Sequence, residues 1–453
     1  MDKGNLVNDF SRLGVVDEGA WSLDVQSNED YTLCPSYPSV FARPAEASED
    51  LVRAVAKYRS QGRLPCLVWR DPAEVGGVLC RAAQPRAGLL SRSSAADQSW
   101  FALIRRAAGA QQGQREVVLL DARSPVAAHA NKFRGGGVEV PSRYGVQTLM
   151  YCHIRNVHHV RRVVVAIRRT QGSPLLQHKK RHAKLMRHWL QLQSLLLAGA
   201  AAAALLVRGG AAVVLHCSDG WDRTPQLSSL CLLLIDATYR TRRGFLLLIE
   251  REWLLMGHRF QLRYALGQPI FVQFLDAVYQ LLHQRPEAFE FNDLFLADLA
   301  AIHDGSPPHG QATPLGTRAP FDADCDAQRA ADSTGVAWDF LLDEDRASVY
   351  HNAKYAPGAT DESAAAGSGA QRTSIMSPID VDTHSFALRV WEPLRRMTAH
   401  ALPPPATTGG VPCGCWPSAR GELAGMEVVA GAPDPDRGIE LLVTPSAVHR
   451  VHS

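Results

Sequence analysis

The sequence lacks several features that would place the protein in a specialised class. Its 453 residues include nine cysteines, an odd number without a repeated Cys-x-x-Cys pair, so neither a disulfide framework nor a structural zinc site is expected. The first residues hold no apolar run of the kind that begins a signal peptide. The longest apolar run, residues 195–207, is shorter than the about 20 residues that a membrane-spanning helix needs. We therefore expect a soluble or peripheral protein whose reduced thiols suit the cytoplasm.

The chain also lacks a large excess of charge of either sign. It has 48 lysines and arginines against 45 acidic residues, a net charge of +3, and nothing in that total calls for a nucleic-acid partner, although a near-neutral sum can hide a local basic site. Hydrophobic residues make up 46% and charged residues 21% of the sequence. This balance is typical of a globular chain and excludes a wholly disordered or collagen-like one.

Short apolar runs alternate with helical patterns through the first 300 residues. Three runs are typical of buried strands: residues 63–70, 117–121 and 211–216. Helical patterns cover residues 51–58, 100–108, 178–207, 226–239, 244–255 and 271–282. Because strands alternate with helices, we expect an α/β fold with a mainly parallel central sheet flanked by helices.

The composition changes after residue 303. Residues 304–335 and 357–374 are rich in Gly, Pro, Ala, Ser and Asp, and we expect them to be low-complexity loops or disordered insertions. No strong motif appears in residues 399–453, which we expect to form a disordered tail. The sequence therefore predicts one main domain over residues 1–398.

The most informative segment is a Cys-x5-Arg motif, His216-Cys-Ser-Asp-Gly-Trp-Asp-Arg-Thr224, between a predicted strand and a predicted helix. A loop of this length can turn its backbone N–H groups around an oxyanion, while the helix N-terminus adds partial positive charge. Arg223 can bind a phosphate through two parallel hydrogen bonds. The same positive field favours the thiolate of Cys217, the nucleophile needed for a phospho-cysteine intermediate. Gly220 and Thr224 at these positions argue against an inert buried cysteine.

Two acids lie within this loop. If both were ionised and pointed at the bound substrate, they would repel its negative charge. We expect one of them to donate a proton to the leaving alkoxide. Asp222, next to Arg223, is the better candidate. The alternative is a carboxylate that only caps the helix or orients Arg223, with Asp219 or water as the donor.

Residues 216–224 resemble the active-site signature of the myotubularins, lipid phosphatases of the cysteine-dependent, tyrosine-phosphatase-like fold. The Asp-Gly-Trp-Asp interior of the loop separates this signature from those of tyrosine and dual-specificity phosphatases. The resemblance covers about residues 9–398. Its main segments outside the loop are residues 31–39, 63–70, 84–85, 121–123, 130–132, 135–137, 156–158, 257–260 and 269–274.

The resemblance implies hydrolysis of the 3-phosphate of phosphatidylinositol 3-phosphate and phosphatidylinositol 3,5-bisphosphate. It assigns Cys217 as nucleophile, Arg223 as phosphate clamp and Asp222 as proton donor. The substrate-binding residues that it implies are Ser218, Asp219, Gly220, Trp221, Thr224, Asn131, Asn156, Val157, Arg259 and Arg263. Arg259 and Arg263 are four residues apart and are expected on one helical face, where they could hold a second phosphate. Thiolate, arginine and backbone donors supply the charge stabilisation, so we expect neither a metal nor a cofactor.

The resemblance also sets expectations about partners and location. The family usually begins with a membrane-binding domain of the pleckstrin-homology type, whereas this chain enters the phosphatase pattern near residue 9, so either that domain is absent or the sequence is truncated. The expected partner is a phosphoinositide in a membrane surface, met by a cytoplasmic protein that is peripheral at endosomal-type membranes. A homo- or heterodimer with a myotubularin relative is a further expectation, although no coiled-coil heptads follow residue 398.

Two alternative functions stay open from the sequence. One is a catalytically silent scaffold, because inactive myotubularin relatives act as partners of active ones. Silent members lose the nucleophile or the clamp, however, and Cys217 and Arg223 are both present. The other is a protein tyrosine or dual-specificity phosphatase, against which the two acids of the loop argue.

Overall fold

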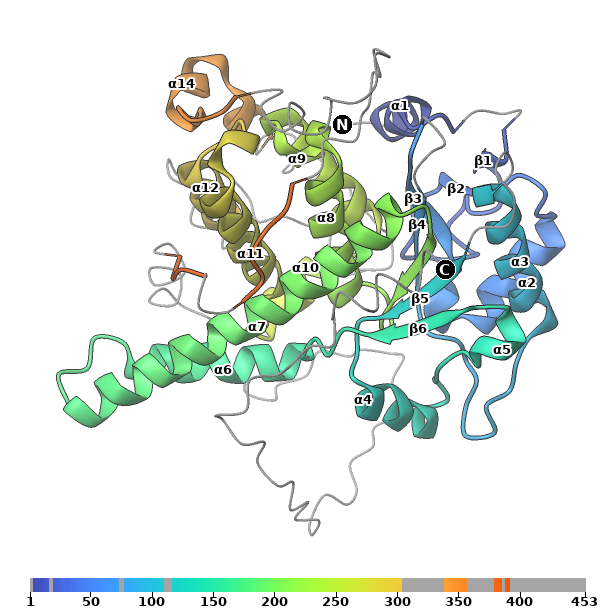
Figure 1. Ribbon diagram of the computed structural model, residues 1–453, viewed down its shortest axis with the longest axis horizontal. Coiled ribbons are helices and arrows are strands. Elements are labelled where there is room, and N and C mark those ends of the chain that lie inside the picture. The colour runs from blue at the N-terminus through green and yellow to red at the C-terminus, as the bar shows by residue number, and fades with distance from the viewer. Residues whose placement is uncertain are drawn as a thin grey trace, which may run out of the picture. The chain divides into compact units, whose positions relative to one another are not determined.

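The computed structural model describes residues 3–15, 19–72, 77–109, 116–303, 338–356, 379–384 and 388–391. Most of these residues form an α/β unit in which helices cover both faces of a central sheet (Figure 1). The expected low-complexity loops, residues 304–335 and 357–374, and the expected tail, residues 399–453, lie outside the described residues. Those three expectations stay predictions.

The described secondary structure follows the alternation that the sequence predicts. The strands are β1 (Trp21–Asp24), β2 (Phe41–Pro44), β3 (Cys66–Arg70), β4 (Val78–Ala82), β5 (Val117–Asp121), β6 (Thr148–Tyr151) and β7 (Ala212–His216). The longer α-helices are α1 (Lys3–Arg12), α2 (Glu49–Tyr58), α3 (Ala95–Gly109), α6 (Val157–Thr170), α7 (Leu176–Arg208), α8 (Arg223–Ile235), α9 (Arg242–Ile249), α11 (Ile270–Gln284) and α12 (Asp293–His303).

Shorter helical segments connect these elements. The short α-helices are α4 (Pro125–Ala130), α5 (Pro141–Tyr144), α10 (Phe260–Ala265) and α14 (Ala347–Tyr350). The 3-10 turns are η1 (Ser60–Gly62), η2 (Asn131–Arg134), η3 (Ala237–Arg240), η5 (Pro286–Ala288) and η6 (Glu344–Arg346), and η4 (Glu250–Leu255) continues α9 as a π-helical turn.

The seven described strands form one sheet in the order β1-β2-β3-β4-β7-β5-β6. Strands β4, β7, β5 and β6 run parallel, which confirms the expected parallel arrangement for the half of the sheet that carries the Cys-x5-Arg loop. The first four strands pair antiparallel, an arrangement that the sequence pattern does not predict. The link from β3 to β4 explains part of this difference, because residues 71–77 are too few for the crossover that a parallel pair requires.

Strand β7 lies between two parallel neighbours and is covered on both faces. Val213 pairs with Leu79 of β4 on one side and with Val118 of β5 on the other. Every residue of β7 is buried, which accounts for its nearly continuous apolar sequence. The carboxyl end of this central strand therefore gives the following loop a rigid base.

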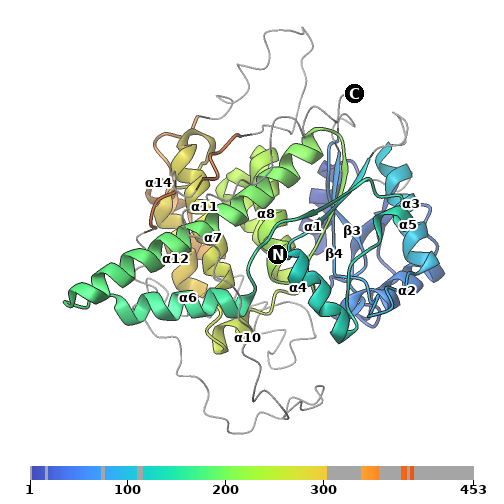
Figure 2. The same ribbon diagram turned by 60° about the horizontal axis from the view of Figure 1, so that its bottom comes forward.

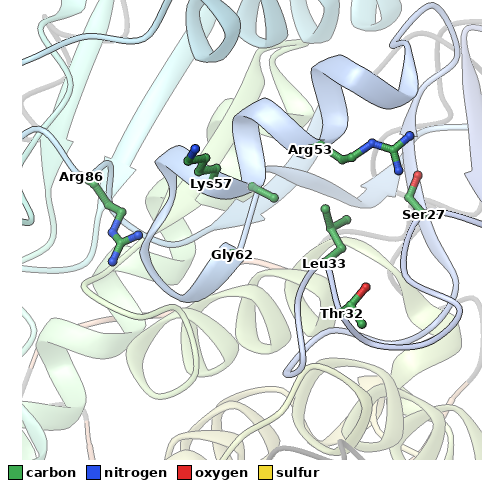
Figure 3. A pocket seen from close by; sticks show the side chains of 8 residues that line it. Ser27, Thr32, Leu33, Arg53, Lys57, Gly62 and Arg86 are labelled. Carbon is green, nitrogen blue, oxygen red and sulfur yellow. The ribbon is translucent and has the colours of Figure 1, made fainter. Parts of the chain in front are cut away.

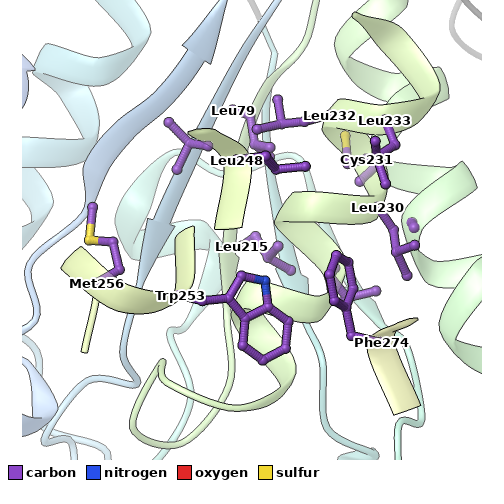
Figure 4. Close-up of a cluster of buried hydrophobic side chains, with 14 of the residues drawn as sticks. Leu79, Leu215, Leu230, Cys231, Leu232, Leu233, Leu248, Trp253, Met256 and Phe274 are labelled. Carbon is purple, nitrogen blue, oxygen red and sulfur yellow. The ribbon is translucent and has the colours of Figure 1, made fainter. Parts of the chain in front are cut away.

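The core beneath that loop is built mainly by α8 packing against β4 and β7. Figure 4 shows side chains of α8, among them Leu230, Leu232 and Leu233, in one buried cluster with Leu79 and Leu215 of the sheet. Trp253 packs against Phe274 with ring centroids 4.9 Å apart, and its Nε1 donates a hydrogen bond to Ser229 of α8. All thirteen residues of α8 are buried, so the helix that follows the loop is held as firmly as the strand before it.

Helix α7 has the length and hydropathy that crossing a membrane would need, judged on composition within the described residues. Half of its most apolar window is buried inside the protein, where it contacts α8, α11 and β7. This is the environment of a core helix in a globular domain.

A buried histidine at the end of α12 predicts a pH-dependent contribution to stability. His303 contacts the rings of Phe260 and Phe271, and its Nδ1 has no hydrogen-bond partner. Burial, together with nearby His258, lowers the pKa of His303 to about 3. The folded protein therefore keeps this ring neutral, whereas the unfolded chain protonates it below its ordinary pKa of about 6.5. Stability is lost as the pH falls through 6.5, by roughly 2 kcal/mol at pH 5.

Urea unfolding at pH 7 and pH 5 measures this contribution. The variant His303→Leu should lose about 2 kcal/mol less stability between these two pH values than the unmodified chain. Other buried groups titrate alike in both proteins and cancel in the comparison. Equal losses in the two proteins would show that His303 accepts a proton in the folded state.

Candidate active site

The Cys-x5-Arg loop connects the end of β7 to the start of α8, as the sequence predicts. Cys217 lies at the bottom of the loop, where only 2% of the residue is exposed. Its Sγ accepts hydrogen bonds from the backbone N–H of Gly220 at 3.3 Å and from the Thr224 hydroxyl at 3.2 Å. Both donors stabilise negative charge on sulfur, and the N-terminus of α8 acts in the same direction.

Gly220 gives the loop its curvature. Its φ of +80° lies in the left-handed region, and a Cβ at this position would come within 2.8 Å of the carbonyl oxygen of Ala82. The carbonyl of Gly220 accepts hydrogen bonds from Arg63 at 2.9 Å and from Arg81 at 2.7 Å, both from buried guanidiniums. These bonds hold the carbonyl away from the sulfur while the N–H of the same residue faces it.

Arg223 is the first residue of α8 and is 8% exposed. Its guanidinium donates to the hydroxyl of Ser218 at 3.2 Å and to the carbonyl of Ile154 at 3.4 Å. The Arg223 side chain thus bridges the loop and the segment that precedes α6. This placement next to Ser218 keeps a fixed cation beside the cysteine loop, as anion binding requires.

Asp222 forms a bidentate ion pair with Arg263 of α10. The two oxygen–nitrogen distances are 2.8 and 2.6 Å, and Arg263 also donates to Gln268 at 2.8 Å. Burial raises the pKa of the Asp222 carboxyl, but the charge and hydrogen bonds of Arg263 lower it further, so the net pKa lies below its ordinary value. Asp222 is therefore ionised in this arrangement, and it orients Arg263.

His258 completes the environment of this ion pair. Its Nδ1 lies 2.6 Å from the carbonyl oxygen of Trp221, to which it donates, and 3.5 Å from the Asp222 carboxylate. Burial lowers the pKa of His258 to about 4 despite the nearby carboxylate. The neutral ring is a fixed hydrogen-bond donor to the loop backbone.

Asp219, the second acid of the loop, has a different environment. One of its carboxylate oxygens accepts a hydrogen bond from the Ser60 hydroxyl at 3.0 Å. Burial raises the pKa of Asp219 by more than that bond lowers it, and the charge of Asp222 acts in the same direction as burial. Of the two acids, Asp219 is the one whose protonated form the surroundings favour.

A buried polar network supports the loop from below. His216 lies with its Nε2 3.3 Å from Glu139, and Glu139 in turn pairs with Arg59. Arg59 also binds Asp97 of α3 at 2.6 Å. Burial lowers the pKa of His216, but Glu139 raises it to a net value above the ordinary one. The network ties the last residue of β7 to α3 through paired charges that the interior covers completely.

Gln84 links the cysteine loop to the glycine loop at residues 135–137. Its backbone N–H donates to the carbonyl of Ser218 at 3.0 Å, while its side-chain oxygen accepts from the N–H of Gly137 and from Arg123. A Cβ on Gly136 would come within 2.5 Å of the Gln84 amide, so a larger residue there would displace this side chain. The contact brings the segment that contains Asn131 to the side of the cysteine loop.

The structure gathers most of the predicted site residues around the loop. Ser218 binds Arg223, Trp221 lies beneath the Arg259 guanidinium at 5.7 Å from its ring centroid, and the Asn156 side chain caps α6 at the residue before Val157. The amide of Asn131 donates instead to Ala127 in α4, so its described contact is local.

The expectation that Arg259 and Arg263 share one helical face stays a prediction, and the backbone N–H of Arg263 donates to the carbonyl of Arg259 at 2.9 Å, as in a helical turn. Helix α10 begins at Phe260, and Arg259 is its N-cap residue with φ −85° and ψ 66°. The positive φ of Gly257, +68°, turns the chain just before this point. The two guanidiniums have neighbouring partners in the cysteine loop, the ring of Trp221 for Arg259 and the carboxylate of Asp222 for Arg263.

Several supporting residues were not predicted as part of the site: Ser60, Arg63, Arg81, Gln84, Glu139 and His258. Three of the segments quoted for the family resemblance contain Arg63, Gln84 or His258. That resemblance was the available signal, but the roles depend on contacts between distant parts of the chain.

A basic surface cavity of about 420 Å³ lies close to the loop, between α2, η1 and residues 27–33 (Figure 3). Its lining is Ser27, Thr32, Leu33, Arg53, Ala56, Lys57, Gly62 and Arg86. It shares η1 with the site, since Ser60 of η1 binds Asp219. No group of three or more His, Cys, Asp or Glu residues in the described ranges is arranged to hold a metal ion.

Comparison with known proteins identifies the family. The family described as "Myotubularin-like phosphatase domain" matches residues 2–306. The chain is 40% identical over 307 residues to phosphatidylinositol-3,5-bisphosphate 3-phosphatase MTMR2 of Gallus gallus, a match that covers 64% of this chain and 51% of the relative. It is 35% identical over 354 residues to myotubularin of Rattus norvegicus, covering 74% of this chain and 56% of the relative. The chain spans about half the length of these relatives, and by its phosphatase domain it belongs to the myotubularin family.

Proposed function

We propose that the protein is a phosphoinositide 3-phosphatase that acts on phosphatidylinositol 3-phosphate and phosphatidylinositol 3,5-bisphosphate. The observation that carries the proposal is the Cys217 sulfur at the N-terminus of α8, with hydrogen bonds from Gly220 and Thr224 and with Arg223 beside Ser218. The similarity to MTMR2 relatives, which are named phosphatidylinositol-3,5-bisphosphate 3-phosphatases, supports the choice of the 3-phosphate.

In the proposed reaction, the Cys217 thiolate attacks the phosphorus of the 3-phosphate. A sulfur–phosphorus bond forms as the bond from phosphorus to the inositol oxygen breaks, and this oxygen takes a proton from an acid of the loop. Water then attacks the phospho-cysteine and gives a proton to the carboxylate of the same loop acid, so that the sulfur–phosphorus bond breaks, inorganic phosphate is released and the thiolate and the acid are restored. The N–H of Gly220 and the hydroxyl of Thr224 stabilise the sulfur as it leaves, and Arg223 neutralises the phosphoryl oxygens.

The proton donor can be assigned by comparing the two loop acids. A donor role for Asp222 predicts that Asp222→Asn lowers kcat by about 10²-fold or more. The matched variant Asp219→Asn should then have a much smaller effect on kcat. Because Asp222 is ionised beside Arg263, its donor role requires that substrate binding draws Arg263 toward a phosphate and lets the carboxyl take up a proton. If Asp219→Asn instead causes the larger loss, the donor is Asp219, whose pKa is already raised.

The remaining proposed contacts concern the inositol ring and its second phosphate. We assign ring and phosphate contacts to Asn131, Asn156, Val157, Arg259 and Arg263, which lie on the segments around the loop. The location at endosomal-type membranes and the pairing with a myotubularin relative remain proposals that follow from the family.

A phosphate-release assay over a panel of substrates tests the function. The panel holds singly and doubly phosphorylated phosphoinositides and a phosphotyrosine peptide, with the Cys217→Ser protein as blank. We expect release only from the lipids that carry a 3-phosphate. Release mainly from the peptide would support the tyrosine phosphatase alternative, and no release from any substrate by the folded protein would support the scaffold alternative.

A further inference from the structure

Helices α6 and α7 form a hairpin that projects from the body of the protein, as Figures 1 and 2 both show. We call residues 155–188 of this hairpin the basic arm. Its base lies at the candidate active site, because α6 begins at Val157 and the carbonyl of nearby Ile154 accepts a hydrogen bond from Arg223. Its tip is the turn between Thr170 and Leu176, which end and begin the two helices.

The arm concentrates positive charge in a chain that is nearly neutral overall. Residues 140–218 contain no aspartate or glutamate, while the whole chain has a net charge of only +3. Eight arginines and lysines of the arm are exposed: Arg155, Arg162, Arg169, Lys179, Lys180, Arg181, Lys184 and Arg187. None of these eight forms an ion pair within the described part of the chain. The cations are therefore available to an anionic partner.

Packing within the arm holds these cations on its outside. The seam between the helices is apolar and buries Val163 and Ile167 of α6 and Met186 of α7. Polar contacts join the helices along the same seam, with the Nε2 atoms of His159 and His188 3.0 Å apart. These contacts hold the two helices together, so the exposed cations of the arm keep fixed positions relative to one another.

The tip adds exposed apolar surface to this charge. Leu175 and Leu176 are 50% and 68% exposed, and Lys179, the first lysine of α7, follows three residues after Leu176. Both side chains therefore leave half or more of their surface in water at the end of a projecting hairpin. Leucines flanked by Lys and Arg match the layered chemistry of a membrane surface, with acyl chains beneath anionic headgroups.

We propose that the basic arm docks the protein on an anionic lipid bilayer, with Leu175 and Leu176 entering the interface and the cations facing lipid phosphates. The proposal deepens the proposed function and rests on it, because a lipid phosphatase must meet its substrate in a membrane. Nucleic acid is the other anionic partner to test. The exposed leucines would have no role in binding it, and Trp189, just beyond the arm, is fully buried and cannot stack on a base.

Vesicle co-sedimentation of the full chain tests the proposal with three variants. The vesicles are phosphatidylcholine alone or mixed with phosphatidylserine. The charge variant carries Lys179→Gln, Lys180→Gln, Arg181→Gln and Lys184→Gln, and the tip variant carries Leu175→Ser and Leu176→Ser. A matched control removes four exposed cations elsewhere, at Arg53, Lys57, Arg86 and Lys354.

The unmodified chain should bind the anionic vesicles and bind phosphatidylcholine alone weakly. Since each cation near an anionic surface contributes about 1 kcal/mol, the charge variant should bind at least about 10²-fold more weakly, whereas the control should keep most of its binding. The tip variant should also bind more weakly. Equal losses in the charge variant and the control would overturn the proposal, because binding would then follow net charge. The proposal would also be overturned if the unmodified chain bound an oligonucleotide more tightly than anionic vesicles and the charge variant lost that binding.

Activity separates this proposal from the proposed function. On a short-chain, water-soluble phosphatidylinositol 3-phosphate, the charge and tip variants should match the unmodified chain, which also shows that they fold. On vesicles containing the lipid substrate their rates should fall with binding. If the chain binds vesicles through the arm but hydrolyses neither substrate, the proposed function would be refuted and the docking proposal would stand. If the charge and tip variants hydrolyse both substrates as well as the unmodified chain does, docking through the arm would be refuted.

Discussion

Replacing Cys217 by serine is expected to lower the rate of phosphate release by at least about 10⁴-fold, while substrate binding is retained. The hydroxyl of serine is far less acidic than a thiol, so the positive field at the start of α8 cannot supply an ionised nucleophile there. The backbone of the loop should keep its shape, because the donors from Gly220 and Thr224 can bind an oxygen as well as a sulfur. Phosphate release in single-turnover experiments measures the rate. Binding is measured by how strongly the Cys217→Ser protein competes with the unmodified protein for the substrate.

Cys231 offers a matched control for this substitution. It is also a buried free cysteine and lies in α8, but it packs in the core away from the loop (Figure 4). Cys231→Ala should lower stability modestly and leave the rate per folded molecule unchanged. A Cys217→Ser protein with substantial remaining activity, in the absence of contaminating enzyme, would contradict covalent catalysis at this residue.

Replacing Arg223 by lysine is expected to lower kcat/KM by roughly 10²–10³-fold. Lysine keeps the charge but loses the planar pair of donors, so it cannot bind two phosphoryl oxygens at once. It also loses the contacts of the guanidinium with Ser218 and Ile154, which hold the cation against the loop. Steady-state rates on a water-soluble 3-phosphoinositide measure the effect.

The exposed Arg106, on α3, provides the control for the same change of side chain. Arg106→Lys should leave kcat/KM unchanged, since its partner is the surface residue Glu46. Thermal unfolding of both variants separates a catalytic effect from a folding defect. If a folded Arg223→Lys protein retains nearly full kcat/KM, the phosphate is bound by other groups and the proposed clamp is incorrect.

Much of the fold could be predicted because its strongest signals are local in sequence. The apolar run at residues 117–121 is strand β5 with the same bounds, and the helix expected over residues 178–207 is α7, Leu176–Arg208. The antiparallel strands β1 and β2 have four residues each, too short to show a clear alternation. The antiparallel pairing in that half of the sheet could therefore not be predicted from the hydrophobic pattern of the sequence.

The candidate site divides in the same way. The loop itself could be predicted, because its residues are consecutive and their spacing encodes the chemistry. Its support could not, because the bonds from Arg63 to Gly220 and to Met256 join residues 157 and 193 positions apart. The ionised state of Asp222 likewise depends on Arg263, 41 residues away in another helix.

Direct detection of the phospho-cysteine tests the central claim. The protein is mixed with excess phosphatidylinositol 3-phosphate, quenched in denaturant within one turnover, and digested for mass spectrometry at neutral pH. The account predicts that the peptide containing Cys217 gains the mass of one phosphoryl group, and that the Cys217→Ser protein does not. Phosphate release with no modification of Cys217 at any quench time, or with the group on another residue, would contradict the account.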